Sequence, residues 1–181
     1  MGQTIVFQEN FDPVSLADSV TSVGNPSWAI DATLSVSAPN SYVNQVGLAT
    51  TNTLESDAFS TVGNTFVLLN FDQICKIEFF DAATIEVSDD NGTTWTQLTC
   101  NDYLGSGTFC ASGNKFASNA YLIWDPATPT TVPQNSWWQS ETFDVSWYRK
   151  RIRDNHFKLC PESYLQKLEL KKYSNSTVKS Y

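Results

Sequence analysis

Short runs in which apolar and polar residues alternate recur along the chain, and no helical period is visible before about residue 160. The clearest runs are residues 4–11, 65–71 (TFVLLNF) and 74–80 (ICKIEFF), the last two separated by Asp72 and Gln73. Shorter runs lie at 27–30, 46–50 and 120–124, and the segment SWWQSETFDVS (136–146) should place Trp137 and Trp138 on opposite faces if it is extended. Period-two alternation between turn residues predicts β-strands. We therefore predict an all-β protein, a two-sheet antiparallel β-sandwich of the jelly-roll type.

Residues 83–98, ATIEVSDDNGTTWTQL, form the best-defined segment and predict a β-hairpin. Its two alternating arms are joined by Asp-Asp-Asn-Gly, where Gly92 can supply the positive φ of a tight turn. Five positions fit the pattern S-x-D-x-G-x-T-W: Ser88, Asp90, Gly92, Thr94 and Trp95. In such a turn the short carboxylate accepts backbone N–H bonds while the tryptophan packs beneath. We expect these five residues to be structural.

The last part of the chain differs from the rest in charge. Residues 1–145 contain two lysines and 16 acidic residues, a net charge of -14, whereas residues 146–181 contain nine Lys or Arg and three acidic residues, a net charge of +6. Pro161, followed by Leu165, Leu168 and Lys172 at helical spacing, predicts a short amphipathic helix. We therefore expect a sandwich module over 1–145 and a basic tail over 146–181 that stays outside it. A truncated or frame-shifted reading, or a different C-terminal segment, would produce this change.

The charge distribution limits the possible partners. An acidic body argues against binding to nucleic acid or anionic membranes, which need a concentrated positive surface, and is compatible with cations or neutral glycans. The basic tail can contact a polyanion or the acidic body itself. No apolar run has membrane length, so membrane insertion is not expected. There is no signal peptide, and Met1-Gly2 fits either a start added where a leader was removed or a cytosolic start.

The cysteines predict one disulfide. Cys100 and Cys110 bracket the Gly- and Ser-containing loop NDYLGSGTF, and a bridge between them would stabilise the fold by about 3 kcal/mol on the chain-entropy model. Cys75 lies in an apolar run and is predicted to be a buried free thiol. There is no C-x-x-C pair, so a zinc site is not expected.

The residue types needed for catalysis are scarce. A sialidase needs clustered arginines, but all three, Arg149, Arg151 and Arg153, lie in the tail. A glycosidase needs two carboxylates at a set separation. Glu78 and Glu86 could form such a pair by chance, but a solvated strand face is the better explanation for them. His156 is the only histidine and no G-x-S-x-G motif occurs, which excludes a nucleophilic triad. We predict no enzymatic activity, with a sialidase or another glycoside hydrolase as remote alternatives.

The aromatic residues suggest binding instead. Sugar rings stack on exposed aromatic side chains, and the sequence has six Trp and seven Tyr. The candidates for ligand binding are Trp28, Tyr103, Trp124, Trp137 and Trp138, and core packing is the alternative role for each. An exposed platform would favour carbohydrate recognition. Buried tryptophans would favour a structural spacer or a protein-adhesion module without a small-molecule site.

The order of several landmarks resembles a known family. FQENFD, LESDAF, ICKIEFFDAATIEVSDDNGTTWTQL, YLIWDP and SWWQSETFDVS are similar to the secreted jelly-roll adhesin modules of Bacteroidetes-type bacteria, related to cleaved-adhesin, choice-of-anchor and reelin-like domains. The turn motif resembles the Asp-box, which is structural in sialidases and reelin-type repeats. The resemblance covers about residues 3–145 and stops at Ser146.

The resemblance carries expectations about function. It implies a noncatalytic secreted or cell-surface module, exported by the type IX secretion system, that binds glycans or cell-surface proteins or acts as a spacer. It also implies a structural calcium ion held by Glu9, Asp12 and Asp144, because Ca²⁺ prefers several oxygen ligands. The alternative is that these three are turn and cap carboxylates. The oligomeric state is left open.

Overall fold

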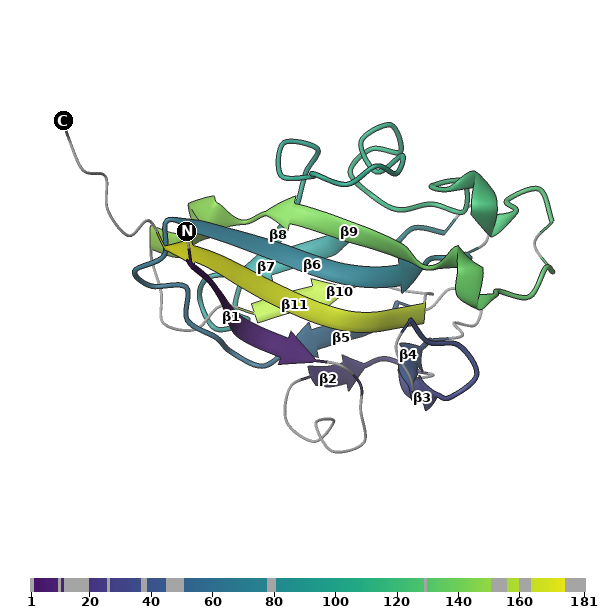
Figure 1. Cartoon of the computed structure of the whole chain (residues 1–181), viewed down its shortest axis with the longest axis horizontal. Coiled ribbons are helices and arrows are strands. Elements are labelled where there is room, and N and C mark those ends of the chain that lie inside the picture. The colour runs from purple at the N-terminus through teal and green to yellow at the C-terminus, as the bar shows by residue number, and fades with distance from the viewer. Residues whose placement is uncertain are drawn as a thin grey trace.

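The computed structural model describes residues 2–9, 11, 20–25, 27–36, 39–44, 51–77, 81–128, 130–150, 156–159 and 164–174. These residues form two antiparallel sheets, one in front of the other in Figure 1. The predicted all-β, two-sheet sandwich is confirmed. No helix of the described residues is long and apolar enough to cross a membrane.

The front sheet of Figure 1 has six strands, which are β1 (Gly2–Glu9), β3 (Ala29–Asp31), β4 (Ser41–Val43), β6 (Phe66–Ile74), β9 (Gln139–Asp144) and β11 (Tyr164–Ser174). Their order is β3-β4-β11-β6-β9, and β1 also pairs with β11. The second sheet contains β2 (Val20–Val23), β5 (Thr53–Ser56), β7 (Ile85–Ser88), β8 (Thr96–Gln97) and β10 (His156–Leu159), in the order β2-β5-β10-β7-β8.

Strand β6 shows how the sequence pattern builds the core. Val67, Leu69 and Phe71 are buried between the sheets, while Phe66 is exposed. The break expected at Asp72 and Gln73 does not occur, because β6 continues through both residues to Ile74. The polar side chains are accommodated across the sheet: Gln73 donates to Glu141, and Ser140 on β9 donates to Asp72. Sequence polarity was therefore a poor guide to the end of this strand.

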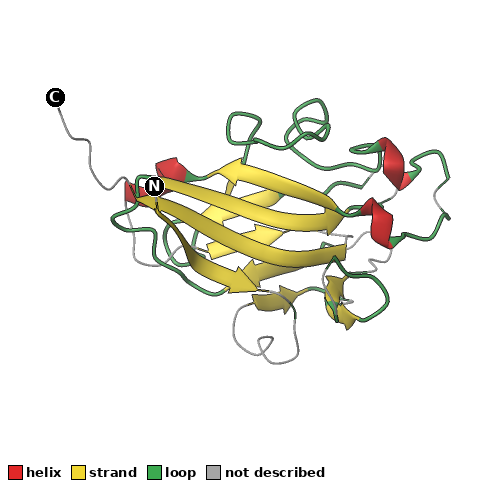
Figure 2. Cartoon of the chain, viewed as in Figure 1, coloured by secondary structure: helices red, strands yellow, loops and turns green. Residues whose placement is uncertain are grey.

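Two other predicted strands are 3-10 turns in the structure. Residues 122–124 form η1 (Leu122–Trp124), which ends at Asp125 in the left-handed conformation with φ of 48°. Trp137 closes η2 (Asn135–Trp137), so the extended segment begins only at Gln139. The strand predicted at 46–50 lies outside the described residues. Figure 2 shows these short helices and the surrounding loops gathered beside β9 and at one end of the sandwich.

The C-terminal segment is part of both sheets, which corrects the prediction of a tail outside the sandwich. β11 lies between β6 on one side and β1 and β4 on the other, as the yellow strand of Figure 1 shows. β10 lies between β5 and β7. The module therefore does not end at residue 145. The register pairs Lys158 with Glu55 on one neighbour and Glu86 on the other.

A β-bulge explains why the segment looked helical. In β11 the register with β6 shifts between Gln166 and Leu168, so one extra residue is inserted there. The spacing from Leu165 to Leu168 then becomes three instead of two, although both positions lie opposite buried residues of β6, Gln73 and Phe71. A strand with one bulge thus produced the spacing that we interpreted as a helix.

Candidate functional site

The connection between β8 and β9, residues 98–138, is long, and its described residues form only η1 and η2 as regular elements. Its first part runs beside β9: Asp144 N donates to Asp102 O at 2.7 Å, and Leu104 N donates to Thr142 O at 2.8 Å. Tyr103 forms an isolated antiparallel bridge with Phe143 between these bonds. The loop therefore covers an edge of the front sheet that would otherwise expose unpaired backbone groups.

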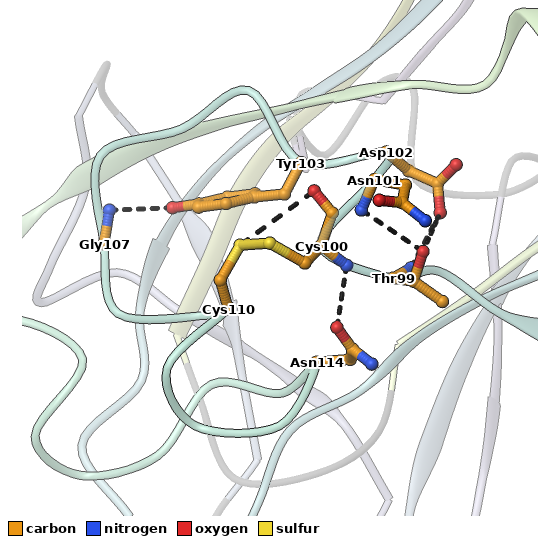
Figure 3. Close-up of a disulfide and its surroundings, with 8 residues drawn as sticks. All are labelled: Thr99, Cys100, Asn101, Asp102, Tyr103, Gly107, Cys110 and Asn114. Atoms are coloured by element: carbon orange, nitrogen blue, oxygen red, sulfur yellow. Dashed lines mark hydrogen bonds between the residues drawn. A yellow bond between two sulfur atoms is a disulfide. The ribbon is translucent and has the colours of Figure 1, made fainter.

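A disulfide closes the first part of this loop, as predicted. Cys100 and Cys110 are joined with a Cα–Cα distance of 4.8 Å. Figure 3 shows that Cys100 N also donates to Asn114 Oδ1, at 2.7 Å. This bond ties the start of the disulfide-closed segment to a residue just beyond its end. Cys75 is buried in the core, as predicted.

Beneath the loop lies a group that we call the inner cluster, Gln73, Tyr103, Tyr121 and Glu141. Gln73 Nε2 donates to Glu141 Oε1 at 3.0 Å, and Tyr103 OH donates to Glu141 Oε2 at 2.7 Å. The two tyrosine hydroxyls lie 3.5 Å apart. Burial raises the pKa of Glu141, while the hydrogen bonds from Gln73 and the tyrosines act in the opposite direction. The pKa of Tyr103 is raised as well. Burial is the main cause, and the hydrogen bonds with Tyr121 and Glu141 add to it.

Two glycines let the loop close over this cluster. Gly107 N donates to Tyr103 OH at 2.8 Å (Figure 3). A Cβ at Gly105 would lie 2.4 Å from Tyr103 OH, and a Cβ at Gly107 would lie 2.7 Å from Tyr121 Cζ. Both distances are too short for a side chain, so glycine is required by close approach. The inner cluster is therefore tightly packed against the loop and held by hydrogen bonds within the protein.

Lys76 holds the second part of the loop. Its Nζ donates to the backbone oxygens of Trp124, Asp125 and Thr128 at 2.8, 2.6 and 2.9 Å. The ammonium group also lies 5.7 Å from the centre of the Trp137 ring. Burial lowers the pKa of Lys76, and the negative charge of Asp125 partly opposes this. The segment fixed in this way exposes three apolar side chains, Leu122, Ile123 and Val132.

The aromatic residues chosen from the sequence do not form an exposed platform. Three of them, Trp28, Trp124 and Trp137, are buried in the core. Trp124 Nε1 donates to Trp137 O at 2.8 Å, which satisfies the indole inside the protein. Tyr103 and Trp138 are partly buried and packed against the core. Core packing, the alternative considered for each, is therefore what the structure shows.

A different tryptophan is exposed. Trp147, in η3 (Ser146–Lys150), has 54% of its surface accessible. Its Nε1 donates to Asp102 Oδ1 at 2.7 Å, and its ring centre lies 3.5 Å from that of Tyr148, which is buried. We call Trp147, Tyr148 and Asp102 the Trp147 platform. Sequence reasoning missed it because residue 147 falls just after the point where the family resemblance ends.

The platform is held from both sides. Asp102 is buried, and its Oδ2 accepts bonds from Thr99 N at 2.7 Å and Thr99 Oγ1 at 2.9 Å. Figure 3 shows Asp102 at the start of the disulfide-closed loop. On the other side, Ser146 Oγ accepts a bond from Val67 N at 3.0 Å, which fixes η3 to β6. Trp147 is therefore attached both to the disulfide-closed loop and to β6.

The predicted hairpin turn lies close to the platform. Burial is the main cause of the raised pKa of Tyr148, and the negative charges of Asp102 and Asp89 raise this pKa further. Asp89 belongs to the hairpin turn. Within the turn, Asp90 Oδ1 accepts a bond from Thr94 N at 2.8 Å, and Oδ2 accepts one from Thr94 Oγ1 at 2.6 Å.

The other residues of the motif complete the turn. Ser88 Oγ donates to Asp90 Oδ1 at 2.8 Å and accepts a bond from Gly92 N at 2.9 Å. Gly92 has a φ of 76°, and a Cβ there would lie 3.7 Å from Trp95 Cζ2. The bonds from Thr94, first its hydroxyl and then its N–H, and from Ser88 lower the pKa of Asp90 to about 2. Membership of the Asp-box class stays a prediction.

The predicted calcium ligands do not form one site. The register links Glu9 to Leu168, Leu168 to Phe71, and Phe71 to Glu141 on β9, so Glu9 lies three strand spacings, roughly 14 Å, from β9. Asp144 is farther along β9, and calcium ligands must lie within about 2.6 Å of the ion. Glu9 and Asp144 therefore cannot bind the same ion, and Asp12 lies outside the described residues.

Both described carboxylates act instead as local caps, the alternative considered above. Glu9 Oε1 accepts a bond from Phe11 N at 2.7 Å, and Asp144 Oδ1 accepts one from Ser146 N at 2.9 Å. The described part of the chain contains no group of three or more His, Cys, Asp or Glu that could hold a metal ion. A calcium ion bound by other ligands stays a prediction.

No protein-family model and no curated protein matches the sequence. The K2 cleaved adhesin domain of Lys-gingipain is similar in structure over 96% of this chain and 100% of that chain, with 13% identity and a TM-score of 0.49. The K1 cleaved adhesin domain of Lys-gingipain from Porphyromonas gingivalis is similar over 97% of this chain and 100% of that chain, with 9% identity and a TM-score of 0.46.

A third similar structure is the enzymatically active domain of tailspike protein 4 from bacteriophage CBA120. The likeness covers 94% of this chain and 19% of that chain, with 8% identity and a TM-score of 0.43. At these identities and TM-scores, no conclusion about ligand or activity follows from the three likenesses.

Proposed function

We propose that this chain is a noncatalytic binding module that acts in adhesion or carbohydrate recognition, in a secreted or cell-surface protein. The observation that carries the proposal is the loop of residues 98–138, which is long for a connection within a sandwich. Loops of this length without strands of their own are uncommon in compact domains and are usually functional when they are ordered. Binding residues are commonly presented by loops on a rigid scaffold.

The construction of the loop supports binding. The Cys100–Cys110 disulfide, the inner cluster and Lys76 fix three separate parts of it. A loop that is ordered before its ligand arrives loses less conformational entropy on binding. The disulfide also fits an oxidising, extracellular compartment. Export by the type IX secretion system belongs to the same proposal and rests on the sequence resemblance alone.

A noncatalytic role is supported by what the carboxylates of the loop region do. Glu141 and Asp102 both use their oxygens to hold side chains or backbone of the protein in place. The carboxylate pair considered above, Glu78 and Glu86, gains no support, because Glu86 is half-buried on β7 and Glu78 lies outside the described residues. A sialidase or another glycoside hydrolase therefore stays the remote alternative.

The second candidate is a protein-adhesion module or spacer without a small-molecule site. It is favoured by the apolar side chains on the segment that Lys76 holds, because Leu122 is 89% exposed and Val132 is 74% exposed. Exposed apolar side chains that form one contiguous patch are typical of protein interfaces, so this candidate requires these side chains to lie side by side. A folded chain that binds extracellular proteins and no saccharide would establish this candidate.

A glycan array and a panel of immobilised extracellular proteins, both probed with the full chain, test the proposal. The array is run with calcium and again with a chelator, which also tests the calcium prediction. We expect selective binding that is lost in the Cys100→Ser/Cys110→Ser variant, provided that its far-UV circular dichroism stays that of a β-protein. Binding that persists unchanged in this variant would contradict the role of the loop.

A further inference from the structure

We infer that Trp147 is the contact residue for a saccharide, whose pyranose ring stacks on the exposed face of the indole. This inference rests on the proposed function, because it names the site and the ligand class of that module. Trp147 is the large aromatic side chain that the fold leaves most exposed among the described residues. The five aromatic residues chosen from the sequence are buried or partly buried.

The surroundings of Trp147 leave one part of the indole available. Its N–H is already donated to Asp102 Oδ1 at 2.7 Å. The Tyr148 ring lies against it, with centres 3.5 Å apart and planes inclined by 34°. Because the edge and one side of the indole have partners within the protein, the exposed 54% offers chiefly an aromatic face.

The indole is also oriented in advance. Asp102 is buried and is itself fixed by Thr99 N and Thr99 Oγ1. η3 is fixed to β6 by the bonds of Val67 with Val145 and Ser146. A large side chain that already has one orientation loses little rotamer entropy when a ligand covers it.

The chemistry of the surface matches a sugar. An aromatic face is electron-rich, and the C–H groups on one face of a pyranose carry partial positive charge, so the two stack favourably. The sugar hydroxyls point outward from that face and need polar partners. Polar residues border the platform: Asp89 acts on Tyr148 electrostatically, Thr96 is exposed on β8, and Asn101 is exposed next to Asp102. An apolar face with a few polar groups around it is typical of small-ligand sites.

The test compares two variants of Trp147 with a matched control. Trp147→Ala removes the face, and Trp147→Phe keeps a smaller aromatic face without the N–H. Leu122→Ala also shortens an exposed apolar side chain, but on η1, away from the platform. The full chain is first screened on an array of neutral and acidic oligosaccharides, and the strongest binder is then titrated by calorimetry.

We expect Trp147→Ala to weaken binding of that oligosaccharide at least tenfold, Trp147→Phe to weaken it less, and Leu122→Ala to leave it unchanged. All three variants should keep the circular dichroism spectrum of the wild type. Unchanged saccharide affinity in a folded Trp147→Ala variant would overturn the inference and leave the proposed function intact. Binding of extracellular proteins but of no saccharide would overturn the ligand class, and a folded wild type that binds neither would contradict both proposals.

Discussion

Asp102 and Tyr103 are neighbours in the chain, yet they serve two different regions. Tyr103 points inward and donates to the buried Glu141, while Asp102 accepts the N–H of the exposed Trp147. Each region thus pairs an aromatic side chain with a buried carboxylate. In the inner cluster two glycines allow the loop to close over the aromatic rings, whereas in the Trp147 platform the ring stays exposed.

The comparison shows that the same pair of chemical groups can stabilise a fold or prepare a surface. The difference lies in what covers the ring, because a hydrogen bond to a buried carboxylate fixes the aromatic group in both cases. A fixed ring under the loop contributes only to stability. A fixed ring on the surface keeps one face ready for a ligand, and changes there should affect binding more than stability.

The largest expected effect is the loss of stability when the buried Trp124, in contrast to the exposed Trp147, is replaced by alanine. Trp124→Ala removes a fully buried indole and should lower the free energy of unfolding by about 3–5 kcal/mol. Trp147→Ala loses the hydrogen bond to the buried Asp102 and should cost about 1–3 kcal/mol. Urea unfolding of both variants measures the difference. Equal losses would mean that Trp147 is part of the core and would break the comparison.

The next effect concerns the inner cluster. Tyr103→Phe removes the hydroxyl that donates to Glu141 Oε2, and a buried acceptor left without its donor should cost about 1–3 kcal/mol. Ligand binding should be unchanged, because the aromatic ring and Asp102 remain. Urea unfolding and a binding titration of the same variant check both statements. Lost binding with unchanged stability would show that Tyr103, and not Trp147, contacts the ligand.

The pKa of Glu141 adds a pH dependence to this prediction. Burial raises it, so the folded state holds the proton more tightly than the unfolded state, where the value is 4.5. The stabilising contribution is therefore complete below about pH 4.5 and is lost as the pH rises through the folded-state pKa. In Glu141→Gln this loss is absent, so stability relative to the wild type should increase with pH over that range. If the stability difference between Glu141→Gln and the wild type did not change with pH, the raised pKa of Glu141 would be contradicted.

The smallest effect is expected at the hairpin turn beside the platform. The pKa of Asp90 is lowered from 3.8 to about 2, so the ionised Asp90 carboxylate stabilises the fold. This contribution is present above pH 3.8 and is lost as the pH falls to about 2. Asp90→Asn should be slightly less stable than the wild type at pH 7 and equal to it near pH 2. Thermal unfolding at several pH values measures this. A difference that does not shrink in acid would show that the turn is held without the Asp90 charge.

Local sequence patterns predicted the features that depend on neighbouring residues. The hairpin turn followed from Asp90 and Gly92, and the disulfide followed from two cysteines at either end of a short loop. The alternation over residues 65–71 predicted a strand, and β6 begins there at Phe66. In each case the residues that carry the pattern also make the contacts.

Features that depend on distant partners were not predicted. Gln73 remains in a strand because Glu141, on another strand, accepts its hydrogen bond. The bulge in β11 is visible only in its register with β6, so its leucine spacing imitated a helix. Tryptophan exposure is likewise a tertiary property: Trp124 is enclosed by the fold, while Trp147 is held outward by Asp102.

Hydroxyl-radical footprinting of the full chain, with and without the oligosaccharide selected on the array, tests the Trp147 platform most directly. Mass spectrometry reports the oxidation of each tryptophan. Without ligand, we expect Trp147 to be oxidised faster than the buried Trp28, Trp124 and Trp137, and saturating oligosaccharide should protect Trp147 while leaving Leu122 unchanged. Protection of other residues, with Trp147 oxidised at the same rate as before, would contradict the account.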